Sequence, residues 1–139
     1  MKTKIFASIG IIALFSMLIF ISGCSKTAPP VQVNGSTVSI YLFYGEGCPH
    51  CAAEKPFLEE MKKTYNVEVT EYEVWYNKDN KALFEKMALA YNVSPDGVPM
   101  TFIGENYFVG FSDSIQQQIE SKIDFCTKFN CSNPGDKLR

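Results

Sequence analysis

The feature that most constrains this chain is a pair of cysteines at the junction between an expected strand and an expected helix. Residues 47–51 have the sequence Gly-Cys-Pro-His-Cys, and they follow the apolar run 38–44. That run suits a strand buried on both faces. Apolar residues then recur at helical spacing over residues 52–65. We therefore predict that Cys48 lies at the N-terminus of a helix, with Cys51 one turn further on.

This placement predicts redox chemistry. A helix N-terminus favours an anion, because its first N–H groups are unpaired and its dipole is positive there. Such a position lowers the pKa of a cysteine from about 8.5 to roughly 3.5–7.5. We expect Cys48 to be the nucleophile and the more exposed sulfur. Cys51 is on the same helical face, so its sulfur can resolve the mixed disulfide that Cys48 forms with a partner.

Two other roles for these cysteines remain open, namely a structural disulfide or half of a zinc site. A zinc site needs four ligands, which Cys48, Cys51, Cys126 and Cys131 could supply. A Cys-x-x-Cys and a Cys-x4-Cys separated by a whole domain are poor support for such a site. The single histidine excludes multi-histidine metal sites. We predict no bound metal and no cofactor.

The N-terminus has the parts of a targeting signal. Lys2 and Lys4 precede an apolar stretch at 5–21 and the small residues Ser-Gly-Cys. Residues 21–24 resemble the lipobox of bacterial-type lipoproteins, a family whose signal is cut before the cysteine, which is then lipidated. The resemblance implies that Cys24 is a lipid anchor. The alternative is an uncleaved membrane helix, since the stretch has 17 residues and a span needs about 17–25. Both place the domain outside the cytoplasmic membrane.

The rest of the chain is long enough for one domain. Residues 1–23 form the signal or anchor, and 24–36 form a tether that includes Ala-Pro-Pro and Asn-Gly-Ser and has no apolar period. The 116 residues from Cys24 onward suit a single core, with the domain at 37–125. They carry 11 Lys and Arg against 15 Asp and Glu, so a nucleic-acid partner is not expected. We expect a monomer.

The last two cysteines form a second close pair. Cys126 and Cys131 are expected to follow the last helix and to form a local disulfide that staples the C-terminal tail, 126–139. With Cys24 assigned to a lipid, no thiol is left over, which suits an oxidising compartment. A second redox pair that relays electrons is the alternative role for these two residues.

Periodicity predicts the remaining elements. Alternation over 67–74 predicts a strand, and an apolar stripe over 78–91 predicts a helix. Residues 100–103 and 107–109 suit a hairpin whose turn is Gly-Glu-Asn. Asp113, with Gln three residues later, resembles a capping box that opens a third helix. Trp75 is expected in the core.

The order of these elements favours an α/β fold. A strand, helix and strand suggest a right-handed parallel crossover, and the later hairpin is antiparallel. A mixed sheet of about four strands with helices on both faces is therefore expected.

These features together resemble the thioredoxin superfamily. Cys48-Pro49-His50-Cys51 matches its active-site motif, Pro56 its kink proline, and Gly97-Val98-Pro99 its cis-proline loop. The resemblance implies a thioredoxin-like fold, a cis Pro99, and backbone groups around Val98 that pair with an extended substrate. The Pro-His dipeptide is similar to that of the periplasmic oxidant DsbA. It implies catalytic roles for Pro49 and for His50, which would stabilise the Cys48 thiolate if protonated.

One position departs from the family pattern. Many thioredoxins have a buried acid six residues before the first cysteine, and this chain has Leu42 there. The route by which a proton reaches and leaves the resolving thiol is therefore in doubt. Glu46 is a possible substitute, although a solvated loop carboxylate is the more common role for such a residue.

We therefore expect a membrane-tethered thiol–disulfide oxidoreductase that acts outside the cytoplasm as an oxidant or isomerase. Its partners would be protein thiols and disulfides and a membrane redox protein that recharges the pair. Two alternatives remain open. One is a thiol reductant in the maturation of cytochromes or other proteins, and the other is a metal-handling or binding lipoprotein.

Overall fold

The computed structural model describes residues 35–139. The predicted signal or anchor, Cys24 and nearly all of the predicted tether lie outside the described residues. Within residues 35–139, none of the helices has the length and apolar character that a membrane crossing requires.

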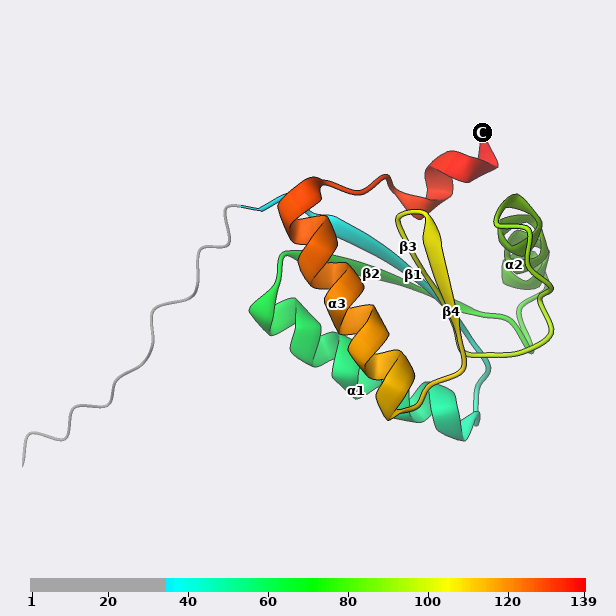
Figure 1. Cartoon of the computed structure of the whole chain (residues 1–139). Coiled ribbons are helices and arrows are strands. Elements are labelled where there is room, and N and C mark those ends of the chain that lie inside the picture. Colours follow the sequence, from blue (N-terminus) through cyan, green and yellow to red (C-terminus); the bar gives the residue numbers. More distant parts are fainter. Residues whose placement is uncertain (1–34) are drawn as a thin grey trace, which may run out of the picture.

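The chain forms a mixed four-stranded sheet with helices on both faces, as predicted (Figure 1). In chain order the elements are β1 Val38–Tyr44, α1 Pro49–Thr64, β2 Val67–Glu73, α2 Lys78–Ala90, β3 Met100–Ile103, β4 Asn106–Val109, α3 Asp113–Phe129 and the short 3₁₀ helix η1 Pro134–Leu138. The strand order is β2-β1-β3-β4. β1 is parallel to β2 and antiparallel to β3, and β3 is antiparallel to β4.

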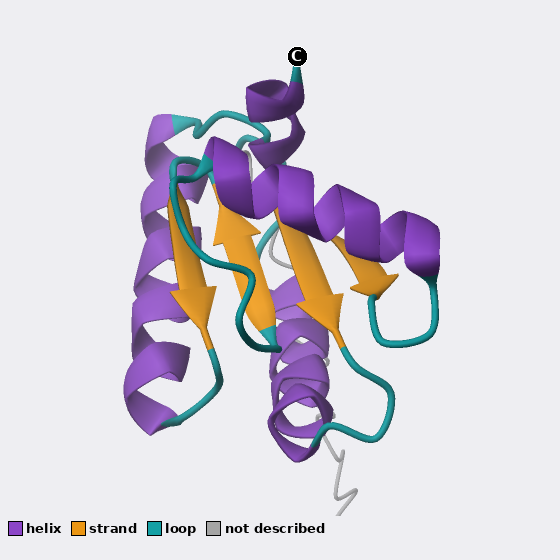
Figure 2. Cartoon of the chain, turned by 90° about the vertical axis from the view of Figure 1, so that its right-hand side faces the viewer, coloured by secondary structure: helices purple, strands orange, loops and turns teal. Residues whose placement is uncertain are grey.

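The two faces of β1 have separate cores, because successive side chains of a strand point to opposite faces. Leu42 lies on the face covered by α1 and α3, in one cluster with Leu58 and Ile119. Phe43 lies on the other face, in a cluster with Phe84 of α2. Figure 2 shows α2 crossing one face of the sheet, with the other two long helices, α1 and α3, on the opposite face. The central strand is thus fixed from both sides.

The last helix differs from its prediction at both ends. Its N-cap is Ser112, whose hydroxyl accepts the Ile115 N–H, and Asp113 is the first helical residue. The helix continues to Phe129, so the prediction that Cys126 follows the last helix is wrong. The physical reason is that Cys126 extends the buried stripe of the helix by one more turn and is 1% exposed.

Candidate active site

The cysteine pair lies where β1 ends and α1 begins, as the sequence predicts. Cys48 is the N-cap residue of α1, and its N–H donates to the Gly45 carbonyl at 3.1 Å. Pro49 occupies the first helical position, where its fixed φ suits the helix and no N–H is needed. Gly47 has a φ of +83°, a conformation that favours glycine. The local sequence therefore turns the chain sharply from strand to helix and leaves Cys48 at the turn.

The two cysteines are free thiols held one helical turn apart. The Cys51 N–H donates to the Cys48 sulfur at 3.3 Å. Cys48 is 6% exposed and Cys51 is 1% exposed, so Cys48 is the more accessible sulfur, as predicted. The Cys51 N–H and the positive end of the helix dipole both stabilise negative charge on the Cys48 sulfur.

A surface hollow of about 260 Å³ opens at the pair. Both cysteines contribute to its lining, together with Gly45 and Lys55. The Lys55 ammonium lies 2.8 Å from the Glu71 carboxylate. The hollow gives water and small reagents a path to a pair of sulfurs that are otherwise largely covered.

The Cys51 thiol is difficult to ionise. Burial is the largest cause, and together with the hydrogen bond to Cys48 and the nearby Glu54 carboxyl it raises the pKa of Cys51 to about 12. A thiol with this pKa is almost entirely protonated near neutral pH, whereas the thiolate is the form that attacks a disulfide. Cys51 therefore needs a base beside it if it is to act as the resolving sulfur.

Glu54 supplies a candidate for that base, although it was not among the site residues predicted from the sequence. It is completely buried, and the Thr101 hydroxyl donates to its Oε1 at 2.5 Å. Its Oε2 is buried without a hydrogen-bond partner among the described residues. Burial raises the pKa of Glu54 to about 7, although the Thr101 hydrogen bond opposes the shift. The carboxyl can therefore gain or lose a proton near neutral pH, one helical turn from Cys51.

A helical pattern could have found Glu54. Cys51, Glu54, Leu58 and Met61 follow one another at spacings of three, four and three, and all are buried. Leu42, where the family carries an acid, is also completely buried. Glu46, the possible substitute named in the sequence analysis, is exposed and is therefore not a buried acid. The described part of this chain thus has a buried carboxyl at Glu54 of α1, and an apolar side chain at Leu42 of the central strand.

The His50 side chain contacts the segment that precedes α3. Its exposed ring places Nδ1 at 3.2 Å from the Phe111 carbonyl, which accepts a hydrogen bond when Nδ1 carries the proton. His50 thus connects the first turn of α1 to that segment, and its expected stabilisation of the Cys48 thiolate stays a prediction.

The loop before β3 faces Cys48. The Val98–Pro99 peptide bond is cis, as the resemblance implies. The Cys48 thiol lies 3.7 Å from the Val98 carbonyl, within reach of a weak S–H···O hydrogen bond. The structure thus brings together Cys48, Cys51, Val98 and Pro99, which are far apart in the sequence.

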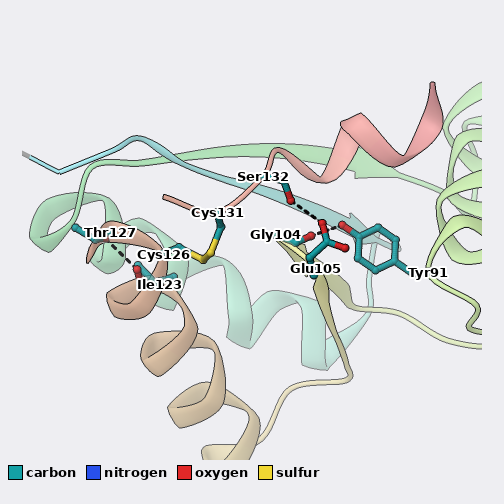
Figure 3. Close-up of a disulfide and its surroundings, with 8 residues drawn as sticks. All are labelled: Tyr91, Gly104, Glu105, Ile123, Cys126, Thr127, Cys131 and Ser132. Atoms are coloured by element: carbon teal, nitrogen blue, oxygen red, sulfur yellow. Dashed lines mark hydrogen bonds between the residues drawn. A yellow bond between two sulfur atoms is a disulfide. The ribbon is translucent and has the colours of Figure 1, made fainter. Parts of the chain in front are cut away.

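The second cysteine pair lies elsewhere. Cys126 and Cys131 form the predicted disulfide, with an S–S distance of 2.08 Å. Figure 3 shows this bond joining α3 to the segment before η1, next to Gly104 in the β3–β4 turn. A Cβ on Gly104 would lie 2.9 Å from that of Cys131. No group of three or more potential metal ligands occurs within the described part of the chain.

Trp75 is not in the core. Its side chain is 53% exposed, whereas the preceding Val74 is 5% exposed. The prediction fails because β2 ends at Glu73 and Trp75 lies in the loop beyond the sheet. Its ring contacts Gly45, so closely that a Cβ on Gly45 would lie 2.2 Å from ring atoms.

Comparison with known proteins bears on the fold. No family model matches the sequence, and no curated protein matches it. The glutaredoxin grx-1 from Archaeoglobus fulgidus is 18% identical, with a TM-score of 0.48 over 62% of this chain and 86% of its own. A protein from Chlorobium tepidum described as a thiol:disulfide interchange protein, DsbE, is 17% identical, with a TM-score of 0.50 over 67% of this chain and 82% of its own. With the element order and the sheet topology, the second likeness identifies the described part of this chain as a thioredoxin-like α/β fold.

Proposed function

We propose that this protein is a thiol–disulfide oxidoreductase that exchanges disulfides with protein substrates through Cys48 and Cys51. The observation that carries the proposal is the position of the Cys48 sulfur, which caps α1 and accepts the Cys51 N–H at 3.3 Å. The buried Glu54 supports it, because a carboxyl with a pKa of about 7 at this place is costly for stability and useful for proton transfer.

The reaction in the reducing direction has two steps. The Cys48 thiolate attacks one sulfur of the substrate disulfide, and the other substrate sulfur leaves as a thiolate. Cys51 then gives its proton to the Glu54 carboxylate and attacks the Cys48 sulfur, which releases the second substrate thiolate. Two electrons pass from the pair to the substrate, and the pair becomes a disulfide. In the oxidising direction each step is reversed, and Glu54 returns the proton to Cys51.

Neighbouring groups suit the binding of an extended substrate segment. Pro99 has no N–H, and the Val98 carbonyl faces the reacting sulfur. A segment that lies along the loop can pair with its free backbone groups, in the way that an added strand pairs with a sheet edge.

We propose that the net direction in the cell is oxidation or isomerisation. The Cys51 N–H donates to the Cys48 sulfur at the N-terminus of α1. A donor there favours the thiolate and therefore the reduced pair, which makes the disulfide a stronger oxidant. The reduction potential, measured by equilibration with glutathione, is expected on the oxidising side of the midpoint between about −270 mV for thioredoxin and about −120 mV for DsbA. A value close to that of thioredoxin would instead favour the alternative, a reductant in protein maturation.

We also propose that the domain is tethered outside the cytoplasmic membrane, through a lipid on Cys24 or through an uncleaved N-terminal helix. The order of charged, apolar and small residues before Cys24 supports this. The tether would enter the domain at the start of β1, whereas Cys48 follows the end of that strand. The active site would therefore face away from the attachment point and toward proteins in the extracytoplasmic space. A membrane redox partner would need an extracytoplasmic domain to contact it.

A trapping experiment tests the activity. In a Cys51→Ser variant the mixed disulfide on Cys48 cannot be resolved, so substrate proteins are expected to accumulate as adducts that dithiothreitol releases. The matched control is Cys48→Ser. This variant should trap few or no substrate proteins, because the buried Cys51 is the poorer nucleophile. If neither variant forms adducts with oxidised model proteins, the proposed function is wrong.

A further inference from the structure

A pocket of about 270 Å³ lies beside the active site, between the start of α2 and the segment before Pro99. Its floor is apolar and consists of Val74, Phe84 and Val98. Trp75 also lines it, together with three charged residues, Lys81, Glu85 and Asp96. An exposed tryptophan over a buried apolar floor is a typical feature of a binding surface.

Trp75 is held firmly although it is exposed. The Glu73 carboxylate accepts the N–H groups of Trp75 at 2.8 Å and of Tyr76 at 2.9 Å. The indole ring lies on Gly45, where no other residue type would leave it room. The Trp75 side of the pocket is therefore preorganised, so a ligand that binds there loses little affinity to ordering it.

The same backbone positions hold the pocket and the reactive sulfur. Gly45 supports the Trp75 ring and accepts the Cys48 N–H. Val98 lines the pocket, and its carbonyl lies 3.7 Å from the Cys48 sulfur. A substrate cysteine bonded to Cys48 would therefore bring its neighbouring residues to the mouth of the pocket.

The size of the pocket limits what it can hold. It is larger than the cavity of about 150 Å³ that binds benzene in another protein, and smaller than most small-molecule sites, which begin near about 300 Å³. One aromatic side chain fits. In an extended segment, side chains on the same side recur every second residue, about 7 Å apart.

We propose that this pocket binds an aromatic side chain located two residues from the substrate cysteine that reacts with Cys48, and so selects which disulfides the protein exchanges. The proposal rests on the proposed function, since it names the substrate class of the same site. It makes Trp75 a specificity-determining residue.

The test uses short peptides that carry one cysteine as a mixed disulfide with thionitrobenzoate. Phe or Ala is placed two residues before or two residues after the cysteine, and release of thionitrobenzoate by the reduced protein is followed. We expect one Phe peptide to react about tenfold faster than its Ala counterpart, a factor that corresponds to about 1.4 kcal/mol. In Trp75→Ala the ratio should fall below about two. Tyr76→Ala is the matched control, because Tyr76 is exposed and does not line the pocket, and it should keep the full ratio.

A second measurement does not depend on the folding of a pocket variant. The chain has one tryptophan, so its fluorescence reports on Trp75 alone. In the Cys51→Ser protein, an adduct with the Phe peptide should shift the emission to shorter wavelength more than an adduct with the Ala peptide.

The outcomes separate the two proposals. Equal rates for Phe and Ala peptides, or a Phe-to-Ala rate ratio that persists in Trp75→Ala, would overturn the proposed role of the pocket in substrate selection. Disulfide exchange itself would remain supported. Failure of every probe, including the small symmetric disulfide of thionitrobenzoate, would overturn the proposed function itself.

Discussion

At the residue scale, Glu54 makes the fold dependent on pH. Its pKa rises from an ordinary value of 4.5 to about 7 because the carboxyl is buried. Below the ordinary value the group is protonated in both the folded and the unfolded chain. Between the two values only the unfolded chain ionises, so stability falls as pH rises, and the loss is complete above about 7.

Glu54→Gln should remove this dependence. Between about pH 5.5 and pH 8.5, the free energy of unfolding of the wild type should fall by about 2 kcal/mol relative to that of the variant. Urea denaturation of both proteins at both pH values measures the difference. Any cost of the new amide is the same at both pH values and cancels. If the two proteins respond to pH in parallel, Glu54 does not titrate in this range.

The same residue should control the resolving step. With Glu54 ionised, Cys51 has a base beside it, so the rate at which Cys51 displaces a small thiol from Cys48 should rise through a pH of about 7. In Glu54→Gln this inflection should disappear. Glu46→Gln is the control, since that carboxylate is exposed, and the inflection should remain. A variant at Glu54 that kept the inflection would assign the proton transfer to another group.

At the element scale, α3 holds one side of the active site through the segment before it. The Phe111 carbonyl contacts His50, and the next residue, Ser112, caps the helix. Ser112→Ala should therefore lower the free energy of unfolding by about 1 kcal/mol, measured by urea denaturation. Ser114→Ala is the control, since the Ser114 hydroxyl accepts a hydrogen bond from Gln118 of its own helix and caps nothing within residues 35–139, and it should have a much smaller effect. If both variants lost the same free energy of unfolding, the N-cap hydrogen bond of Ser112 would contribute no more than an ordinary surface contact.

The elements also show what the sequence could and could not predict. Strand β1 and the start of α1 followed from local pattern, because an apolar run and a Pro after Cys48 have few alternative structures. Glu54 did not follow, since a carboxylate near Glu59 and Glu60 on a polar-looking helix suggests a solvated face. Trp75 did not follow either, because its environment depends on Gly45, which is distant in sequence. The Trp75 miss is a tertiary effect, whereas the helical spacing of Cys51, Glu54, Leu58 and Met61 was a local signal for a buried Glu54.

At the scale of the whole molecule, the two cysteine pairs lie at opposite ends of the sheet. Ile103 pairs with Ile40 across β1 and β3, and the disulfide lies just beyond, next to Gly104. The other end of β1, Tyr44, is four residues further along the strand than Ile40, which corresponds to about 13 Å, and Cys48 lies beyond it. Exchange needs one sulfur to attack another directly. The pairs are therefore too far apart to exchange with each other within one folded molecule, and we expect the disulfide to stabilise the fold.

Replacing both Cys126 and Cys131 by Ala tests this division. The disulfide closes a short loop, with a sequence separation of 5, so its removal should lower the free energy of unfolding by about 2 kcal/mol through the entropy of the unfolded chain. The loss of the buried Cys126 sulfur adds to that cost. The rate at which Cys48 reacts with a small disulfide should stay within about twofold of the wild type, because the bond lies at the other end of the sheet from Cys48 and touches none of the groups that contact its sulfur. Urea denaturation measures the first effect and thionitrobenzoate release the second. A variant that remains folded by circular dichroism but no longer completes exchange would instead assign the second pair to electron relay.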